Sequence, residues 1–114
     1  MPNMQNEKTA MRELDPQYRA RCFEEVACGY TAEEALNEAA RCLNCKNAPC
    51  MKGCPVGVRI PEFIAELAKG NVNAARDVIK TTNALPAVCG RVCPQESQCE
   101  GKCVRGIKGE PVAI

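Results

Sequence analysis

The pattern of apolar and polar positions predicts a series of short helices and no β-strand. Asp15-Pro16 is typical of a helix start, and the first predicted helix runs from there to a stop near Gly29. Thr31 and Glu34 have the spacing of a capping box, and the second predicted helix extends from Thr31 to Leu43. The two apolar stripes are Phe23, Val26, Ala27 and Tyr30, and then Ala32, Ala35, Leu36, Ala39, Ala40 and Leu43. The second helix is expected to lead directly into Cys42 and Cys45.

Two more helices are predicted further along the chain. The third starts near Pro61 and ends at Gly70, and the fourth uses Asn71 as its cap. Their inward residues are predicted to be Ile60, Phe63, Ile64, Leu67 and Ala68 on the third, and Val72, Ala75, Val78 and Ile79 on the fourth. Asn83-Ala84-Leu85-Pro86 breaks the fourth helix, and a Cys-, Gly- and Pro-rich loop is predicted after it. We therefore expect an all-α fold, with a polar arm at 1–14 and one helical domain at 15–114.

The composition indicates that apolar packing alone is not enough to stabilise the fold. Leu, Ile, Val and Phe make up under a fifth of the 114 residues, below the range expected for a self-sufficient core. The net charge of +1 does not match the high charge of disordered chains. Ten cysteines are present, and they are the residues available to bind the fold together.

The composition and the order of residue types exclude several classes of function. The N-terminus lacks the basic and apolar regions of a signal peptide, so we expect a reducing, cytoplasmic location where clustered cysteines bind metal. No apolar run is long enough for a membrane span, and no basic stripe indicates a nucleic acid. The absence of histidine excludes Cys–His catalysis, Cys₂His₂ zinc fingers and Rieske centres. We predict no catalytic residue in this chain.

Eight of the cysteines form two blocks. The first reads Cys42-x₂-Cys45-x₄-Cys50-x₃-Cys54-Pro55, and the second reads Cys89-x₃-Cys93-Pro94-x₄-Cys99-x₃-Cys103. The Cys-x₃-Cys-Pro unit thus occurs twice, as a faint internal repeat. Short loops of this kind let several thiolates converge on one [4Fe–4S] cube. In two-cluster proteins three cysteines of a run hold one cluster, and the fourth, followed by proline, crosses to the other cluster. Cys54-Pro55 matches this crossing role, and by the same logic Cys103, the last cysteine of the second block, should return to the first cluster.

The crossing rule assigns the ligands of two [4Fe–4S] clusters. Cluster one is predicted to take Cys42, Cys45, Cys50 and Cys103. Cluster two takes Cys54, Cys93 and Cys99, with Cys89 as the candidate for its fourth ligand. Gly53, Gly57, Gly90 and Gly101 are expected to let the backbone approach the clusters closely.

Two other chemistries compete with iron–sulfur clusters. Structural zinc would need paired Cys-x₂₋₄-Cys knuckles separated by a longer stretch, and only Cys42-x₂-Cys45 is a good one. Disulfides do not suit a reducing compartment. Cys22 and Cys28 lie on the first predicted helix, away from both blocks, and we predict that they are free thiols outside the ligand set.

From about Met11 to Ile114 the chain resembles the N-terminal domain of the NADPH-dependent glutamate synthase small (beta) subunit family. The same domain occurs in dihydropyrimidine dehydrogenase and in the large subunit of NADH-dependent ferredoxin:NADP⁺ oxidoreductases. The resemblance rests on Met11-Arg12-Glu13-Leu14-Asp15-Pro16, Phe23-Glu24-Glu25-Val26, Gly29-Tyr30-Thr31, Ala40-Arg41-Cys42-Leu43-Asn44-Cys45-Lys46, Cys50-x₂-Gly53-Cys54-Pro55-Val56 and 85–96.

The resemblance implies an electron-transfer domain of a flavo-iron–sulfur oxidoreductase. Electrons would pass between FAD, reduced by NADPH, and a partner redox centre such as that of a large synthase subunit. FAD and NADPH would bind in domains that follow this one, and the chain would be truncated before them. It would then have no turnover alone. The resemblance also implies an oxygen ligand for cluster two shortly beyond Ile114, which would leave Cys89 a bystander. The rival function is a structural zinc or interaction module, and the rival family member is dihydropyrimidine dehydrogenase or the ferredoxin:NADP⁺ enzyme.

Overall fold

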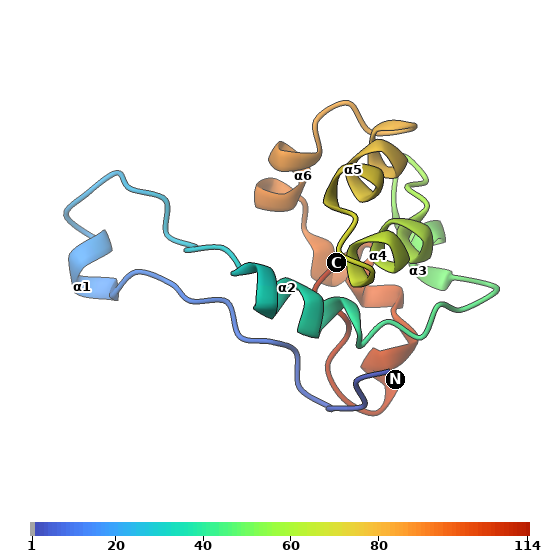
Figure 1. The fold of residues 1–114 in the computed structure, drawn as a ribbon. Coiled ribbons are helices and arrows are strands. Elements are labelled where there is room, and N and C mark those ends of the chain that lie inside the picture. The colour runs from blue at the N-terminus through green and yellow to red at the C-terminus, as the bar shows by residue number, and fades with distance from the viewer. Residues whose placement is uncertain (1) are drawn as a thin grey trace.

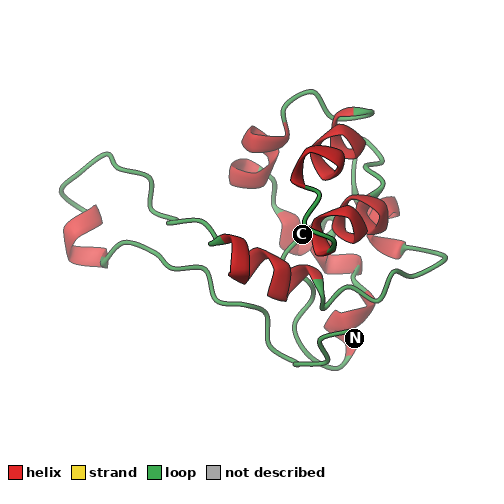
Figure 2. Ribbon diagram, viewed as in Figure 1, coloured by secondary structure: helices red, strands yellow, loops and turns green. Residues whose placement is uncertain are grey.

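The computed structural model describes residues 2–114 as a helical domain (Figures 1 and 2). A long two-legged segment around residues 12–28, which we call the ribbon, projects from this domain. The helices are α1 (Pro16–Arg19), α2 (Ala32–Ala39), α3 (Pro49–Gly53), α4 (Ile60–Ala68), α5 (Val72–Lys80) and α6 (Pro86–Val92). Three 3₁₀ turns follow, namely η1 (Gln95–Ser97), η2 (Glu100–Lys102) and η3 (Val104–Ile107). Residues 2–114 contain no β-strand, which confirms the predicted helical class. None of the helices described is long and apolar enough to cross a bilayer.

The core lies where α4 packs against α5 and α2. Ile60, Phe63 and Ile64 of α4 are buried together with Ala75 of α5, as their helical spacing predicts. Gly70 ends α4 with a φ of +84°, a conformation that a residue with a side chain rarely adopts. Several cysteines lie on the edge of this core, so the cysteine segments and the helices form one packed unit.

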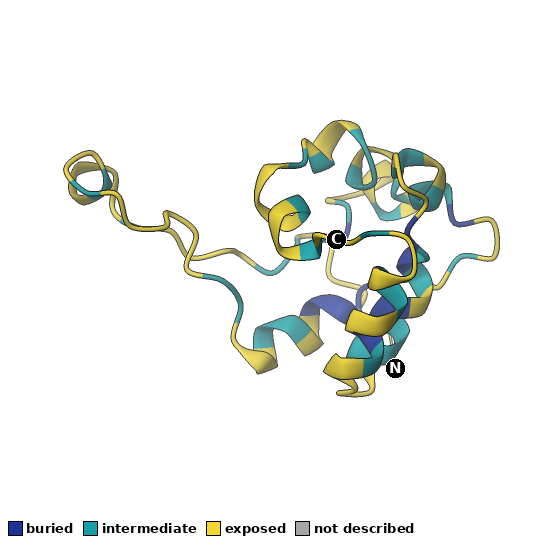
Figure 3. Cartoon of the chain, turned by 90° about the horizontal axis from the view of Figure 1, so that it is seen from above, coloured by how far each residue is buried: buried dark blue, intermediate teal, exposed yellow. Residues whose placement is uncertain are grey.

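The first predicted helix is wrong beyond its first turn. Only Pro16–Arg19 is helical, and the chain then turns back as the second leg of the ribbon seen at the left of Figure 1. The two legs are joined by hydrogen bonds from Leu14 N–H to the Val26 carbonyl (2.9 Å) and from Cys28 N–H to the Arg12 carbonyl (2.7 Å). Most of the predicted apolar stripe has no surface to pack on: Phe23 is fully exposed (109%), as the exposed ribbon in Figure 3 illustrates. Tyr30 is half-buried, and its hydroxyl donates to the carbonyl of Thr9.

Other boundaries also differ from the prediction. The capping box of α2 is present, with Glu34 N–H bonded to Thr31 Oγ1 at 3.2 Å and Thr31 N–H to Glu34 Oε2 at 2.7 Å. However, α2 ends at Ala39, before it reaches Leu43. Asn71 precedes α5, but its side chain donates to Glu66 and forms no cap hydrogen bond. Val72 and Ala68, both predicted to face inward, are exposed. Helix ends are decided by local competition for hydrogen bonds, which apolar spacing does not report.

The Cys-x₃-Cys-Pro repeat forms the same short structure twice. Both α3 and α6 begin with a proline and contain the first cysteine of the repeat. The second cysteine, Cys54 or Cys93, follows the helix in an extended conformation, as a residue before proline prefers. The segment after Pro86 was predicted to be a loop, and it is helical because proline at the first position is compatible with a helix.

Gly53 shows why glycine is needed between the cysteine segments. A Cβ on Gly53 would lie 2.4 Å from the backbone oxygen of Gln98, closer than non-bonded atoms allow. We expect Gly53→Ala to destabilise the domain by about 1–3 kcal/mol, since α3 and the segment before η2 must move apart. A Cβ on Gly106, which lines neither cysteine cavity, would make only ordinary contacts of 3.6–3.8 Å with Pro111. Gly106→Ala is the matched control, and it should change stability by less than about 1 kcal/mol. Urea unfolding of the two variants would show the difference; equal effects would contradict it.

Candidate iron–sulfur centre

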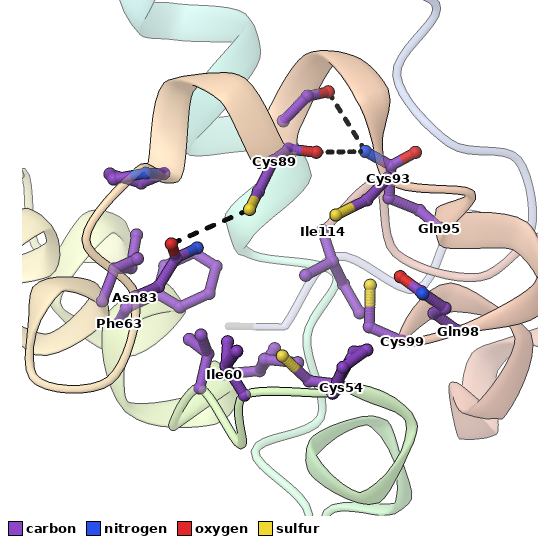
Figure 4. Close-up of a pocket in the computed structure, with 16 residues that line it drawn as sticks. Cys54, Ile60, Phe63, Asn83, Cys89, Cys93, Gln95, Gln98, Cys99 and Ile114 are labelled. Atoms are coloured by element: carbon purple, nitrogen blue, oxygen red, sulfur yellow. Dashed lines mark hydrogen bonds between the residues drawn. The ribbon is translucent and has the colours of Figure 1, made fainter.

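Cysteines from three segments surround a cavity of about 230 Å³, which we call cavity two. Cys54 follows α3, Cys89 and Cys93 lie on and directly after α6, and Cys99 precedes η2. In Figure 4 their sulfur atoms are arranged around Ile114 and point toward the space between them. The rest of the lining is apolar, apart from the amide side chains of Asn83, Gln95 and Gln98. Cys89 Sγ lies 3.7 Å from Asn83 Oδ1, to which the thiol donates.

The other four cysteines of the two blocks surround a second, smaller space of about 20 Å³, which we call cavity one. Cys42 and Cys45 come from the loop after α2, Cys50 from α3, and Cys103 from the junction between η2 and η3. The remaining lining is Leu43, Pro49, Pro61, Val104, Arg105 and Val112.

The structure therefore gathers the eight cysteines into the two sets that the crossing rule gives. Cys50 and Cys54, four residues apart, lie on different cavities, and so do Cys99 and Cys103. Cys89 lines cavity two. Cys22 and Cys28 line neither cavity, because both lie on the ribbon and not on a helix. The role of each cysteine as a ligand stays a prediction.

Burial changes the chemistry of several thiols. Burial raises the pKa of Cys50 to about 11, and the neighbouring Cys103 contributes to the rise. The pKa of Cys42 is raised by burial and by Cys103 and Cys45, against a lowering hydrogen bond from the Asn44 backbone. Burial is also the main cause of the raised pKa values of Cys93 and Cys99. Free thiols of this kind are protonated at neutral pH, so binding of a cationic group must release their protons.

The donor set fits a [4Fe–4S] cluster. Each cavity has four thiols and mainly apolar walls, which is the environment in which such clusters are held. Among residues 2–114, no three Cys, Asp or Glu side chains gather tightly enough to hold a single metal ion. A bound cluster would supply one-electron chemistry, and the thiolates of Cys42, Cys45, Cys50 and Cys103 or of the cavity-two set would hold it.

Next to cavity one, Arg41 and Glu38 form a buried pair that ties together distant parts of the chain. Arg41 is completely buried and Glu38 is 3% exposed, and their Nη1 and Oε1 atoms are 2.7 Å apart. Arg41 donates further hydrogen bonds to the carbonyl oxygens of Gln5 (3.1 Å), Asn6 (3.1 Å), Glu110 (2.7 Å) and Pro111 (3.2 Å). Glu38 accepts from the N–H groups of Thr9 (2.7 Å) and Ala113 (2.9 Å). The residue after Arg41 is Cys42, so this pair anchors the start of the first cysteine block.

The sequence alone does not reveal this buried pair. Glu38 lies in the last turn of α2 and Arg41 lies two residues beyond its end, and their spacing of three is common for exposed ion pairs. The available signal was weak: Glu38 adjoins the buried Ala39 in the sequence. The carbonyl groups that Arg41 binds are far away in sequence, and their positions depend on the completed fold.

The pair makes stability depend on acid pH. Burial alone would raise the pKa of Glu38, but hydrogen bonds from Thr9, Ala113 and Arg41 outweigh it and hold the pKa below the ordinary 4.5. A carboxyl with a lowered pKa stabilises the fold above its unfolded pKa, and this contribution is lost as the pH falls toward the folded value. We therefore expect the difference in unfolding free energy between the wild type and Glu38→Gln to be largest at neutral pH and to narrow below about 4.5.

Urea unfolding of both proteins across this pH range would measure that difference. Loss of iron in acid affects the two proteins alike, so comparing them isolates the carboxyl group. A difference that stays constant from neutral pH to below 4.5 would contradict the prediction.

Comparison with known proteins is consistent with this arrangement. Residues 19–114 match the family model described as dihydropyrimidine dehydrogenase domain II, 4Fe-4S cluster. The chain is 44% identical over 85 residues to the NADPH glutamate synthase small chain of Halomonas elongata, covering 75% of this chain and 18% of that protein. It is 40% identical over 92 residues to the NAD-dependent dihydropyrimidine dehydrogenase subunit PreT of Salmonella typhimurium, covering 81% and 22%. The glutamate synthase small chain of Azospirillum brasilense is 37% identical over 86 residues, covering 75% and 18%.

The chain thus spans about a fifth of the length of the curated relatives it matches. The family match extends over most of the chain and includes all eight cysteines that line the two cavities. The chain therefore belongs to the family of dihydropyrimidine dehydrogenase domain II, the iron–sulfur electron-transfer domain of oxidoreductases of the glutamate synthase and dihydropyrimidine dehydrogenase type.

Proposed function

We propose that this domain passes electrons between a flavin and a partner redox centre through two [4Fe–4S] clusters, one in each cavity. The supporting observation is the sorting of eight cysteines into two sets of four around separate cavities. Cluster one is held by Cys42, Cys45, Cys50 and Cys103, and cluster two by Cys54, Cys93 and Cys99 together with a fourth group. Residues 15–114 form the cluster domain, and residues 1–14 form its arm.

The connections between the two cavities support direct transfer between the clusters. Cys50 and Cys54 are four residues apart, as are Cys99 and Cys103, and each pair has one member on each cavity. Four residues of chain span at most about 14 Å, so two independent links keep the cavities close together. The two clusters are neighbours for this covalent reason.

Cys89 is our candidate for the fourth ligand of cluster two. Its thiol lines cavity two and donates a hydrogen bond to Asn83 Oδ1, a weak partner that a metal can replace (Figure 4). The amide oxygens of Asn83, Gln95 and Gln98 on the same cavity are the alternative donors within this chain. An oxygen ligand from a longer polypeptide would instead leave Cys89 a neighbour of the cluster.

Among the relatives, the glutamate synthase small chain supports the more specific assignment. We propose a cytoplasmic, NADPH-dependent enzyme of this type, with FAD and NADPH bound in a flavin domain of the same polypeptide and a large synthase subunit as the electron acceptor. The PreT relative favours a second candidate, the equivalent domain of an NAD-dependent dihydropyrimidine dehydrogenase. Both candidates require the same two clusters.

Anaerobic iron and sulfide quantitation with electron paramagnetic resonance tests the proposal. The wild type should be brown, bleach on reduction and give two interacting cluster signals. A colourless protein with stoichiometric zinc would instead indicate a structural zinc module. Cys89→Ala decides the fourth ligand: loss of half the iron identifies Cys89 as a ligand, and unchanged iron and spectra identify it as a bystander.

A further inference from the structure

Among residues 2–114, Arg105 is the only cationic side chain on the wall of cavity one. It belongs to η3, two residues after Cys103, and lines the cavity with the four cysteines of that set. The residues that line cavity two, all of them within the described part of the chain, include no Lys or Arg. The two candidate cluster sites therefore differ in charge.

The guanidinium of Arg105 is held on one side and free on the other. Its Nη2 donates to the carbonyl of Gln5, and its Nη1 lies 3.8 Å from the sulfur of Met4, so the N-terminal arm engages both terminal nitrogens. Its Nε atom is buried and has no hydrogen-bond partner. Among the buried side-chain nitrogen and oxygen atoms of residues 2–114, it is the only one without a partner. An unsatisfied buried donor is costly, and it indicates that a group absent from the protein chain accepts from it.

We propose that the Nε–H of Arg105 donates a hydrogen bond to a sulfur of the cluster in cavity one, and that Arg105 raises the reduction potential of that cluster above that of cluster two. The inference rests on the proposed function, since it needs a cluster in cavity one. Sulfur atoms of iron–sulfur clusters accept hydrogen bonds from N–H groups, and both hydrogen bonds and local charge set the reduction potential. Arginine stays protonated at any pH a protein tolerates, so its charge is permanent.

The direction of the effect follows from charge. Reduction adds one electron and makes the cluster more negative, so a fixed cation and an N–H donor stabilise the reduced form more than the oxidised form. The apolar wall of cavity one reduces screening and strengthens this effect. Apart from thiols, the polar side chains on cavity two are neutral amides, so cluster two lacks this stabilisation by a cation. An electron shared by the two clusters should therefore reside mainly on cluster one.

Redox titration of Arg105→Met, followed by electron paramagnetic resonance, tests the inference. At the potential where wild-type cluster one is half reduced, the ratio of reduced to oxidised cluster one should fall about tenfold in the variant, equivalent to a shift of about 59 mV. The shift of cluster two should be smaller. Arg105→Lys keeps the charge but loses the Nε–H donor, and it should give an intermediate shift.

Arg76→Met is the matched control. Arg76 is exposed on α5, pairs with Asp77 and lines neither cavity. Arg76→Met therefore removes one positive charge, as Arg105→Met does, without changing a cluster site. It should leave both potentials unchanged. An equal shift in Arg76→Met and Arg105→Met would overturn the inference, and so would an unchanged potential in Arg105→Met.

A measurement on the unsubstituted side chain covers the case in which Arg105→Met does not assemble. Protein labelled with ¹⁵N-arginine should show a ¹⁵N hyperfine coupling on the signal of reduced cluster one, and Arg105→Lys should abolish it. Absence of this coupling in a protein with full iron content would reject the role of Arg105 while leaving the proposed function intact. Absence of any cluster-one signal in the wild type would instead reject the proposed function.

Discussion

Replacing Arg41 by methionine is expected to destabilise the domain by about 3–5 kcal/mol, because the carboxylate of Glu38 then stays buried without its charged partner. The same change removes donors from four backbone carbonyl groups, which belong to the N-terminal arm and the C-terminal tail. Each carbonyl that stays buried and unpaired adds to the loss. Urea unfolding under anaerobic conditions, followed by circular dichroism, measures the change.

The double variant Glu38→Leu with Arg41→Met tests whether Glu38 and Arg41 form an isolated ion pair or a hub, meaning a pair that also binds the backbone of distant segments. When both members of a simple buried pair are replaced by apolar residues, stability often recovers. Here the carbonyl and N–H groups that bind the pair would remain unsatisfied, so the double variant should stay far less stable than the wild type. Full recovery would contradict the hub. Arg59→Met, which breaks the exposed Arg59–Glu62 pair, should cost at most about 1 kcal/mol and serves as the control.

Substituting one cysteine from each set is expected to remove one cluster at a time. Cys103→Ala should abolish the signal of cluster one and Cys99→Ala that of cluster two, because each substitution removes one of the thiolates proposed to hold that cube. Each variant should contain half the iron and sulfide of the wild type. Because binding of the metal group and folding are coupled, each should also unfold at lower urea concentration.

Cys22→Ala and Cys28→Ala are the controls for these substitutions. Both residues lie on the ribbon and line neither cavity, so iron content, sulfide content and spectra should equal those of the wild type. Loss of both clusters in Cys103→Ala and in Cys99→Ala would show that the two sites cannot form independently. Loss of iron in either control would contradict the ligand sets.

The features that the sequence predicted well are those fixed by local chemistry. The capping box of Thr31 and Glu34 and the α4 stripe around Phe63 depend on residues a few positions apart, and both formed as expected. The placement of cysteines around the two cavities also depends on short spacings. Cys50 and Cys54 are four residues apart and line different cavities, and the same holds for Cys99 and Cys103. The roles of these cysteines as ligands stay a prediction.

The failures share one physical cause, which is dependence on distant parts of the chain. The stripe that starts at Phe23 has helical spacing, yet Phe23 is fully exposed and the two ribbon legs pair in place of a helix. The Arg41 hub required knowledge of where Gln5 and Glu110 meet. The close contact of Gly53 with Gln98 likewise joins segments 45 residues apart, and spacing within either segment carries no trace of it.

The same hub also has a consequence for the order in which this domain is made. Ribosomes deliver the chain from its N-terminus, so Gln5, Glu38 and Arg41 emerge long before Glu110 and Ala113, which complete their hydrogen bonds. Cys103 also emerges late, after the other three thiols of cavity one. Contacts between residues this far apart form slowly, because a long loop must close first. A nascent chain therefore exposes three thiols of this site until Cys103 has been made, and it closes the site only when translation of the domain is nearly complete.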